Sequence, residues 1–339
     1  MRKRALVLAA VILAAAGALW GSRQLSGESS GWTFERLAVP EGELDSFAAR
    51  GSTVLLGMQV EGGESKSSYV LYRSQDGGKS WQRLEEPRDC WRFSFSFHFE
   101  EDGRVIAAGR GVWASSNGGL TWEKVGQLVP ESAVAELDLA PDGTIWLATY
   151  PVEGHRYVYR WDGSWQQVLD DATMGRYGKF RQVVALSGQE ALLVAGHKPG
   201  DVWKTELWRT EDGGRTWTIS EGFPDLARPI VKHAIPLMDW GLLVGTAEEG
   251  IWESRDNGKT WEPFHSSPRG SEVSPRGTSG LLVALVYNGR EPWLYELVGD
   301  GWRRLRKIDR CCVGLTVADC NTIYLTGRPD FLERGVRQR

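Results

Sequence analysis

The sequence is poor in cysteine and histidine, carries little net charge, and has no long amphipathic helical pattern. Among its 339 residues are 4 Cys and 5 His, and the formal charge at pH 7 is −4. Without helical periodicity the chain favours an all-β fold. The near-neutral balance provides no broad positive surface for nucleic acid, so we expect no nucleic-acid partner.

The few cysteines and histidines also lack the spacing of metal ligands. There is no CxxC pair and no Cys/His cluster along the chain, so a structural zinc site is not expected. We therefore predict no metal and no cofactor. The residues concerned are Cys90, Cys311, Cys312, Cys320, His98, His155, His197, His233 and His265.

Glycine and tryptophan are abundant instead, and both recur in one motif. It reads Ser or Thr, a variable residue, Asp or Asn, a Gly pair or near-pair, a variable residue, Ser or Thr, then Trp. Strong copies occupy residues 74–81, 116–122, 210–217 and 254–261, and weaker ones residues 161–165 and 299–302. Asp or Asn before Gly predicts a turn, because Gly accepts positive φ and the side chain can bond nearby amides.

Strand-like residues flank each copy, so each one predicts a hairpin with its Trp packed beneath the turn. This is a structural role for the motif. We assign it to Asp76, Trp81, Asn117, Trp122, Asp212, Trp217, Asp256 and Trp261.

The spacing of the motif predicts a propeller. Trp32, and then the Trp of each copy, recur at intervals of 41 to 52 residues, which is typical of propeller blades. Seven markers predict seven blades. We place them at residues 45–84, 91–125, 134–168, 182–219, 231–264, 280–305, and 313–337 together with 32–37.

These copies resemble the BNR/Asp-box repeats of sialidase-like β-propellers, and that resemblance places the box on the rim. Residues 209–217 are more loosely similar to the repeat of photosystem II assembly factors of the Ycf48/Hcf136 type, and to sortilin-type propellers. Those two groups bind proteins or peptides. Their Gly-Trp-Ala-Val-Gly strand pattern is absent, so no photosynthetic role is implied.

The N-terminal segment predicts export. Arg2, Lys3 and Arg4 precede 16 uncharged residues, 5–20, which would span about 24 Å as a helix. This hydrophobic helix fits a cleaved signal peptide or an uncleaved membrane anchor. We predict that residues 1–22 form this segment, 23–31 a polar linker and 32–339 the propeller, placed in the periplasm or outside the cell.

The lone strand at residues 32–37 has no hairpin partner before it. We expect it to join the last blade and so to close the ring. Cysteines flank two innermost strands, because Cys90 precedes that of blade two and Cys311 and Cys312 precede that of blade seven. A Cys90–Cys312 or Cys90–Cys311 disulfide is the better geometric pairing, while a vicinal Cys311–Cys312 bond and free thiols stay open.

Basic residues recur where second strands end, after a Gly. The loops that lead into each blade should share that face of the propeller and add further arginines. This arrangement predicts a basic face at the channel mouth that binds a protein, a carbohydrate or another anionic ligand. The proposed ligand-binding residues are Arg110, His197, Arg290, Arg328, Arg88, Arg92, Arg228 and Arg310.

The best interpretation is a non-enzymatic binding or scaffold module. The alternative is a glycoside hydrolase of the sialidase or xyloglucanase type, which would need paired carboxylates across a cleft. Spacing selects no pair among Asp89, Glu248, Glu249 and Asp319, and the Arg-Ile-Pro segment of sialidases is missing. No catalytic residue is assigned.

Overall fold

The computed structural model describes most of the chain after residue 30. The described residues are 31–60, 68–85, 96–100, 103–128, 133–174, 178–197, 204–224, 233–237, 241–246, 249–265, 267–268, 272–278, 280–288, 291–308, 312–327 and 329–338. The expected N-terminal helix, and with it the signal or anchor segment, lies outside them.

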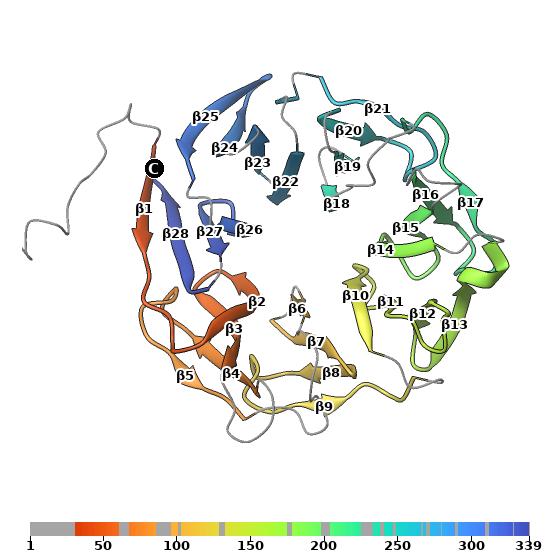
Figure 1. The fold of residues 1–339 in the computed structure, drawn as a ribbon, viewed down its shortest axis with the longest axis horizontal. Coiled ribbons are helices and arrows are strands. Elements are labelled where there is room, and N and C mark those ends of the chain that lie inside the picture. The colour runs from red at the N-terminus through yellow and green to blue at the C-terminus, as the bar shows by residue number, and fades with distance from the viewer. Residues whose placement is uncertain are drawn as a thin grey trace, which may run out of the picture.

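The described strands form seven four-stranded antiparallel sheets arranged around a central axis (Figure 1). Blade one contains β2 (Glu43–Arg50), β3 (Thr53–Val60), β4 (Ser68–Ser74) and β5 (Gln82–Arg83). Blade two contains β6 (Ser96–Phe99), β7 (Val105–Gly109), β8 (Gly111–Ser115) and β9 (Glu123–Lys124). Blade three contains β10 (Val134–Leu139), β11 (Ile145–Thr149), β12 (Tyr157–Trp161) and β13 (Trp165–Asp170).

The remaining blades repeat this order. Blade four contains β14 (Gly178–Ala185), β15 (Ala191–His197), β16 (Lys204–Thr210) and β17 (Thr218–Ile219). Blade five contains β18 (His233–Leu237), β19 (Gly241–Gly245), β20 (Ile251–Ser254) and β21 (Glu262–Pro263). Blade six contains β22 (Glu272–Thr278), β23 (Leu281–Asn288), β24 (Glu291–Val298) and β25 (Gly301–Lys307). Blade seven contains β26 (Cys312–Asp319), β27 (Thr322–Gly327), β28 (Phe331–Arg337) and β1 (Trp32–Arg36).

The seven-bladed propeller and its closure are therefore as predicted. Strand β1 pairs antiparallel with β28, from Trp32 opposite Arg337 to Arg36 opposite Glu333. The first strand of every blade contacts the first strand of the next, and β26 contacts β2, so these strands complete an inner ring.

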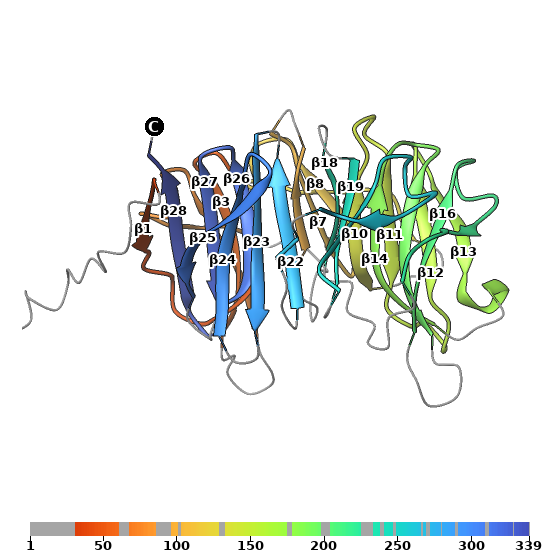
Figure 2. The same ribbon diagram turned by 90° about the horizontal axis from the view of Figure 1, so that it is seen from above.

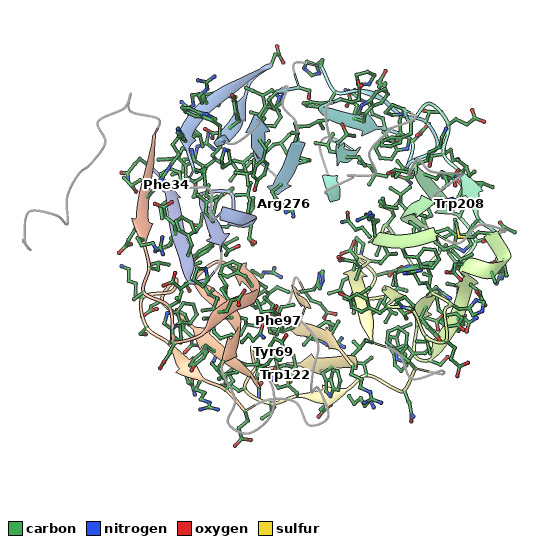
Figure 3. All side chains as sticks on the ribbon, viewed as in Figure 1. Phe34, Tyr69, Phe97, Trp122, Trp208 and Arg276 are labelled. Carbon is green, nitrogen blue, oxygen red and sulfur yellow. The ribbon has the colours of Figure 1, made fainter. Side chains whose placement is uncertain are left out.

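The core lies between blades, not within one sheet. In β7, Val105 and Ala107 pack with Leu55 and Leu71 of blade one, while the alternating Ile106 and Ala108 pack toward blade three. Both faces of such a strand are covered, so it reads as a continuous apolar run instead of an alternating one. Figure 3 shows Phe97, Tyr69 and Trp122, which belong to the cluster between blades one and two.

One element differs from the sequence prediction. The first strand of blade six, β22, precedes the predicted start of that blade at residue 280. Its Pro275 and Gly277 are poor strand signals. Pro is tolerated there because β22 pairs with β23 on one side only, and its other edge needs no backbone donor.

The turns and loops gather on two opposite faces of the disc (Figure 2). We call one the box face: it carries the Asp-box turns and the turns between first and second strands, which touch where the Gly77 amide bonds the Ser52 carbonyl at 2.9 Å. The other, the loop face, carries the second-to-third strand connections and the connections between blades.

Candidate functional site

Each strong Asp-box is a turn closed by its own side chains. In the first copy, the Ser74 hydroxyl accepts the Gly78 amide at 2.8 Å and donates to Asp76 at 2.7 Å. Asp76 in turn accepts the Ser80 amide at 2.9 Å and the Ser80 hydroxyl at 2.6 Å. These bonds, first of all that from the Ser80 hydroxyl, lower the pKa of Asp76 below its usual range. The third copy does the same, and Thr216 lowers the pKa of Asp212 to about 2.

The copy with Asn has the same turn, but the hydrogen bond between its two side chains runs in the opposite direction. Asn117 accepts the Thr121 amide at 2.9 Å, but its Nδ2 donates to the Thr121 hydroxyl at 2.8 Å. The hydroxyl that accepts the Gly119 amide comes from Ser115 and not from Ser116, where the predicted copy begins. Asn can replace Asp here because Thr is both a donor and an acceptor.

The tryptophans of the first and third strong copies, and that of one weak copy, connect neighbouring blades through their indole N–H groups. Trp81 donates its indole N–H to the Ala38 carbonyl at 2.8 Å, just after the closing strand β1. Trp217 of blade four donates to Val168 of blade three at 3.3 Å, and Trp165 of the weak copy in blade three donates to Val125, after β9 of blade two, at 2.6 Å. In these three copies the motif therefore also fixes one blade against the previous one.

Two residues of the predicted basic surface fall in the described chain. Arg110 is exposed in the tight β7–β8 turn on the loop face, and His197 ends β15 on the same face, though its side chain is not described. The other six lie outside the described residues: Arg88, Arg92, Arg228, Arg290, Arg310 and Arg328. A shared basic surface stays a prediction.

A pocket of about 690 Å³ opens at the loop-face end of blade one. Its wall combines apolar residues with charges of both signs. The lining residues are Glu41, Gly42, Glu43, Gln59, Val60, Val70, Tyr72, Arg83 and Pro329. Pro329 belongs to the turn after β27, so the pocket lies where blade seven meets blade one. In volume it falls within the range of small-ligand sites.

Charged residues also line the inner ring. Glu136 and Asp138 lie two residues apart on β10, and Arg276 lies on β22, three blades away around the ring. All three are half-buried, and Figure 3 shows Arg276 directed into the central space. A favourable charge interaction links Glu136 and Arg276. Attraction of this kind acts across the channel.

Burial is the main cause of the shifted pKa values of these three side chains. It raises the pKa of Glu136 to about 7, with Asp138 adding to the rise and Arg276 opposing it. Burial also raises the pKa of Asp138 to about 6, against hydrogen bonds from the Ala185 and Leu139 amides, both at 2.9 Å. Burial lowers the pKa of Arg276 to about 9, so this side chain stays charged at neutral pH.

Sequence reasoning missed this channel group. Acids at alternate positions of a predicted innermost strand were the available signal for Glu136 and Asp138, because such positions share one face. Arg276 had no comparable signal, since its strand was not predicted. The carboxylates considered instead, Glu249 and Asp319, are not part of the group, while Asp89 and Glu248 lie outside the described residues.

The proposed Cys90–Cys312 disulfide also lies outside what the structure describes, since Cys90 is not described and neither is the side chain of Cys312. Cys320 is an exposed free thiol. Among the described residues, no helix has the length and apolar character that a membrane span requires.

The fold and its turns define a β-propeller with BNR/Asp-box repeats. The BNR/Asp-box repeat family matches residues 72–83 and 252–263, which are the first and fourth strong copies. No curated protein matches the chain in sequence.

Solved structures extend the likeness to the whole propeller. A structure described as YCF48 bound to D1 peptide is 16% identical, with a TM-score of 0.57, covering 93% of this chain and 99% of that one. YCF48 from Cyanidioschyzon merolae is 14% identical, with a TM-score of 0.53, covering 89% and 98%. The β-propeller domain of the Trilobed protease from Pyrococcus furiosus is 11% identical, with a TM-score of 0.59, covering 86% and 95%. At these identities the likeness concerns the fold.

Proposed function

We propose that this protein is an exported binding module that takes a segment of a partner protein on its loop face. The segment carries carboxylate groups, and the basic residues predicted around the channel mouth receive them. Export rests on the N-terminal segment, with its basic residues followed by an uncharged run.

The loop-face pocket is the observation that carries this proposal. Val60, Val70 and Tyr72 offer apolar contact, while Arg83 and Glu43 offer charges of both signs. A mixed wall of this kind suits the side chains of a peptide better than it suits a small inorganic anion. Arg328, one of the predicted ligand-binding residues, directly precedes Pro329 along the chain, so a basic residue adjoins the pocket in sequence.

The contrast between the two faces supports the same assignment. On the box face, the Ser, Asp and Thr side chains of each strong copy bond their own turn, as Ser74, Asp76 and Ser80 do. The pocket belongs to the opposite face. The similar fold of YCF48, solved with a D1 peptide, provides a precedent for peptide binding by such a propeller.

Charge reversal on the loop face tests the proposal. The triple variant Arg110→Glu, Arg290→Glu and Arg328→Glu should capture at least about tenfold less of its partner from the native envelope fraction than the wild type does. The matched control reverses one box position in three copies, with Lys79→Glu, Arg215→Glu and Lys259→Glu. We expect that control to bind as the wild type does. Equal capture by both triple variants would refute the basic loop face.

Glu136 and Asp138 give a second candidate function some support. Two carboxyls with pKa values near 7 and 6 are suited to proton transfer at neutral pH, as glycoside hydrolysis requires. Both oxygens of Asp138 already accept backbone amides, however, which suits a wall residue. A panel of fluorogenic glycosides decides: turnover by the wild type that is lost in Glu136→Gln and kept in Glu123→Gln would favour the hydrolase.

A further inference from the structure

Strands β12 and β13 form the outer edge of blade three (Figure 1). A compact group of ligand-type side chains lies at their loop-face end. His155 ends a two-residue turn in which Val152 and His155 exchange backbone hydrogen bonds of 2.7 and 2.9 Å. Both central residues have positive φ, 52° at Glu153 and 90° at Gly154. Positive φ is costly for Glu, so the surrounding contacts hold this turn in a fixed shape.

Two aspartates meet this histidine from the other side. Asp170 ends β13, and Asp171 begins the 3-10 helix Asp171–Met174. The Asp171 amide bonds the Arg156 carbonyl at 3.0 Å, and an oxygen of Asp170 caps the Ala172 amide at 2.9 Å. The backbone therefore fixes both carboxylates relative to the loop that carries His155.

The three side chains converge on one point. The Nδ1 atom of His155 lies 3.4 Å from an oxygen of Asp170 and 3.4 Å from an oxygen of Asp171. One ligand atom from each residue lies within 4.8 Å of the other two. Two ligands held at about 2.0–2.1 Å by a tetrahedral metal are about 3.4 Å apart, so the spacing suits a single ion between them.

Burial of an acidic side chain without hydrogen bonds favours a cation close to this group. The Asp171 side chain is 1% exposed, and neither of its oxygens accepts a hydrogen bond from any described residue. The buried Nδ1 of His155 is likewise without a hydrogen-bond partner in the described chain. The Arg156 guanidinium forms an ion pair with Asp171 at 3.8 Å, so it offsets part of the charge without donating a hydrogen bond. A buried carboxylate in this state is unfavourable unless a positive charge approaches it closely.

We propose that His155, Asp170 and Asp171 bind one divalent transition-metal ion, with Zn²⁺ the best fit. Imidazole and carboxylate are both ligands of Zn²⁺, and these two carboxylates balance its charge. Three protein ligands leave a fourth tetrahedral position for water or another ligand. The ion would fasten the loop before β12 to the connection that leads into blade four.

Spacing along the chain does not indicate this site, because 14 residues, including all of β12, lie between His155 and Asp170. Antiparallel pairing of β12 with β13 brings them together, with Tyr157 opposite Asp170. The proposal does not depend on what the loop face binds, and either can fail without the other.

Metal binding by the full chain tests the proposal. The protein, without a polyhistidine tag, is stripped with a chelator in mild detergent and titrated with ZnCl₂ by calorimetry. Co²⁺ replaces Zn²⁺ for absorption spectra. We expect one ion per chain, the visible bands of tetrahedral Co²⁺, and a thermal midpoint about 3–6 °C higher at a hundredfold excess over Kd.

Four variants make the result specific. His155→Ala and Asp171→Asn should each bind Zn²⁺ at least about tenfold more weakly. His265→Ala and Asp300→Asn, at exposed positions elsewhere, should bind as the wild type does. Because the His155 side chain is 39% exposed, His155→Ala remains decisive if Asp171→Asn fails to fold. A wild type that takes up no Zn²⁺, or undiminished binding by His155→Ala, would overturn the site.

Discussion

At the scale of single residues, the Ser or Thr that opens each box links the third strand to the turn. Ser254 is 2% exposed, accepts the Gly258 amide at 2.8 Å and donates to Asp256 at 2.8 Å. The same pair of bonds recurs at Ser74, Ser115 and Thr210. The hydroxyl is thus the acceptor for an amide that the turn directs inward.

We predict that Ser254→Ala lowers the free energy of unfolding by about 1–2 kcal/mol, because it leaves the buried Gly258 amide without an acceptor. Urea unfolding at pH 7 measures the change. Ser52→Ala, at an exposed serine on the same face, should change the midpoint little. If the two variants unfold at the same concentration of urea, the hydroxyl has no such role.

The residue scale also shows how far sequence reasoning reaches. Turn formation at Asp76 or Asp212 could be predicted because Asp, Gly and Thr leave a recognisable local pattern. The bond from Trp81 to the Ala38 carbonyl could not, since any residue type supplies a backbone carbonyl. Partners of this sort become visible only when two blades are placed side by side.

At the scale of elements, one carboxylate links blade six to the two strands that close the ring. Glu296 of β24 is fully buried and accepts the indole N–H of Trp32, in β1, at 3.2 Å. Arg303 of β25 and Arg337 of β28 pair with its two oxygens at 2.6 and 3.0 Å. Blade six is thereby joined to both strands that close the propeller.

We expect Glu296→Gln to lower the free energy of unfolding by about 2–4 kcal/mol, because two arginines lose their buried counter-charge. Those arginines are 44% and 34% exposed, so water offsets part of the loss. Hydrogen exchange should rise first in β1 and β28. The matched control is Glu262→Gln in the exposed strand β21, and comparable destabilisation by the control would contradict a special role for Glu296.

Strands were predicted correctly where the local sequence favours a strand. They were missed where only the position in the ring makes a strand possible. The joining of β1 to the last blade followed from a lone strand with a marker Trp and no partner. Strand β22 was missed because Pro275 and Gly277 are unfavourable in most strands, and only its place at the inner edge makes them acceptable. Because β22 was not predicted, Arg276 was not recognised as a residue of the channel wall.

At the scale of the whole molecule, the ring brings charges from distant blades into one channel. Glu136 and Arg276 are 140 residues apart, yet the charge of one affects the other. The predicted basic mouth is made of loop residues, whereas the described wall of the channel contains Glu136, a carboxyl group that is only partly ionised near pH 7. Composition alone could not reveal this difference, because it depends on which residues the inner strands direct inward.

The raised pKa of Glu136 has a consequence for stability that can be measured. Between the ordinary value, near 4.5, and the folded value, near 7, the folded chain binds more protons than the unfolded chain does. Its free energy of unfolding must therefore fall as pH rises through this range. Glu136→Gln removes this titration. The free energy of unfolding of the variant, relative to that of the wild type, should therefore rise by about 1–2 kcal/mol between pH 5 and pH 8, a figure reduced for solvent screening in the channel. Urea unfolding at intervals of one pH unit measures it.

Glu123→Gln, in the exposed strand β9, provides the baseline for this comparison, and its curve should run parallel to that of the wild type. Asp138 is present in all three proteins, and its titration enters the comparison only through its charge interaction with Glu136. Parallel curves for Glu136→Gln as well would mean that water reaches this carboxylate freely. A widening gap would mean instead that the channel holds a protonated acid opposite a charged arginine. A partner carboxylate directed into the channel would then meet Arg276 with little repulsion from Glu136, and binding should weaken as Glu136 ionises above pH 7.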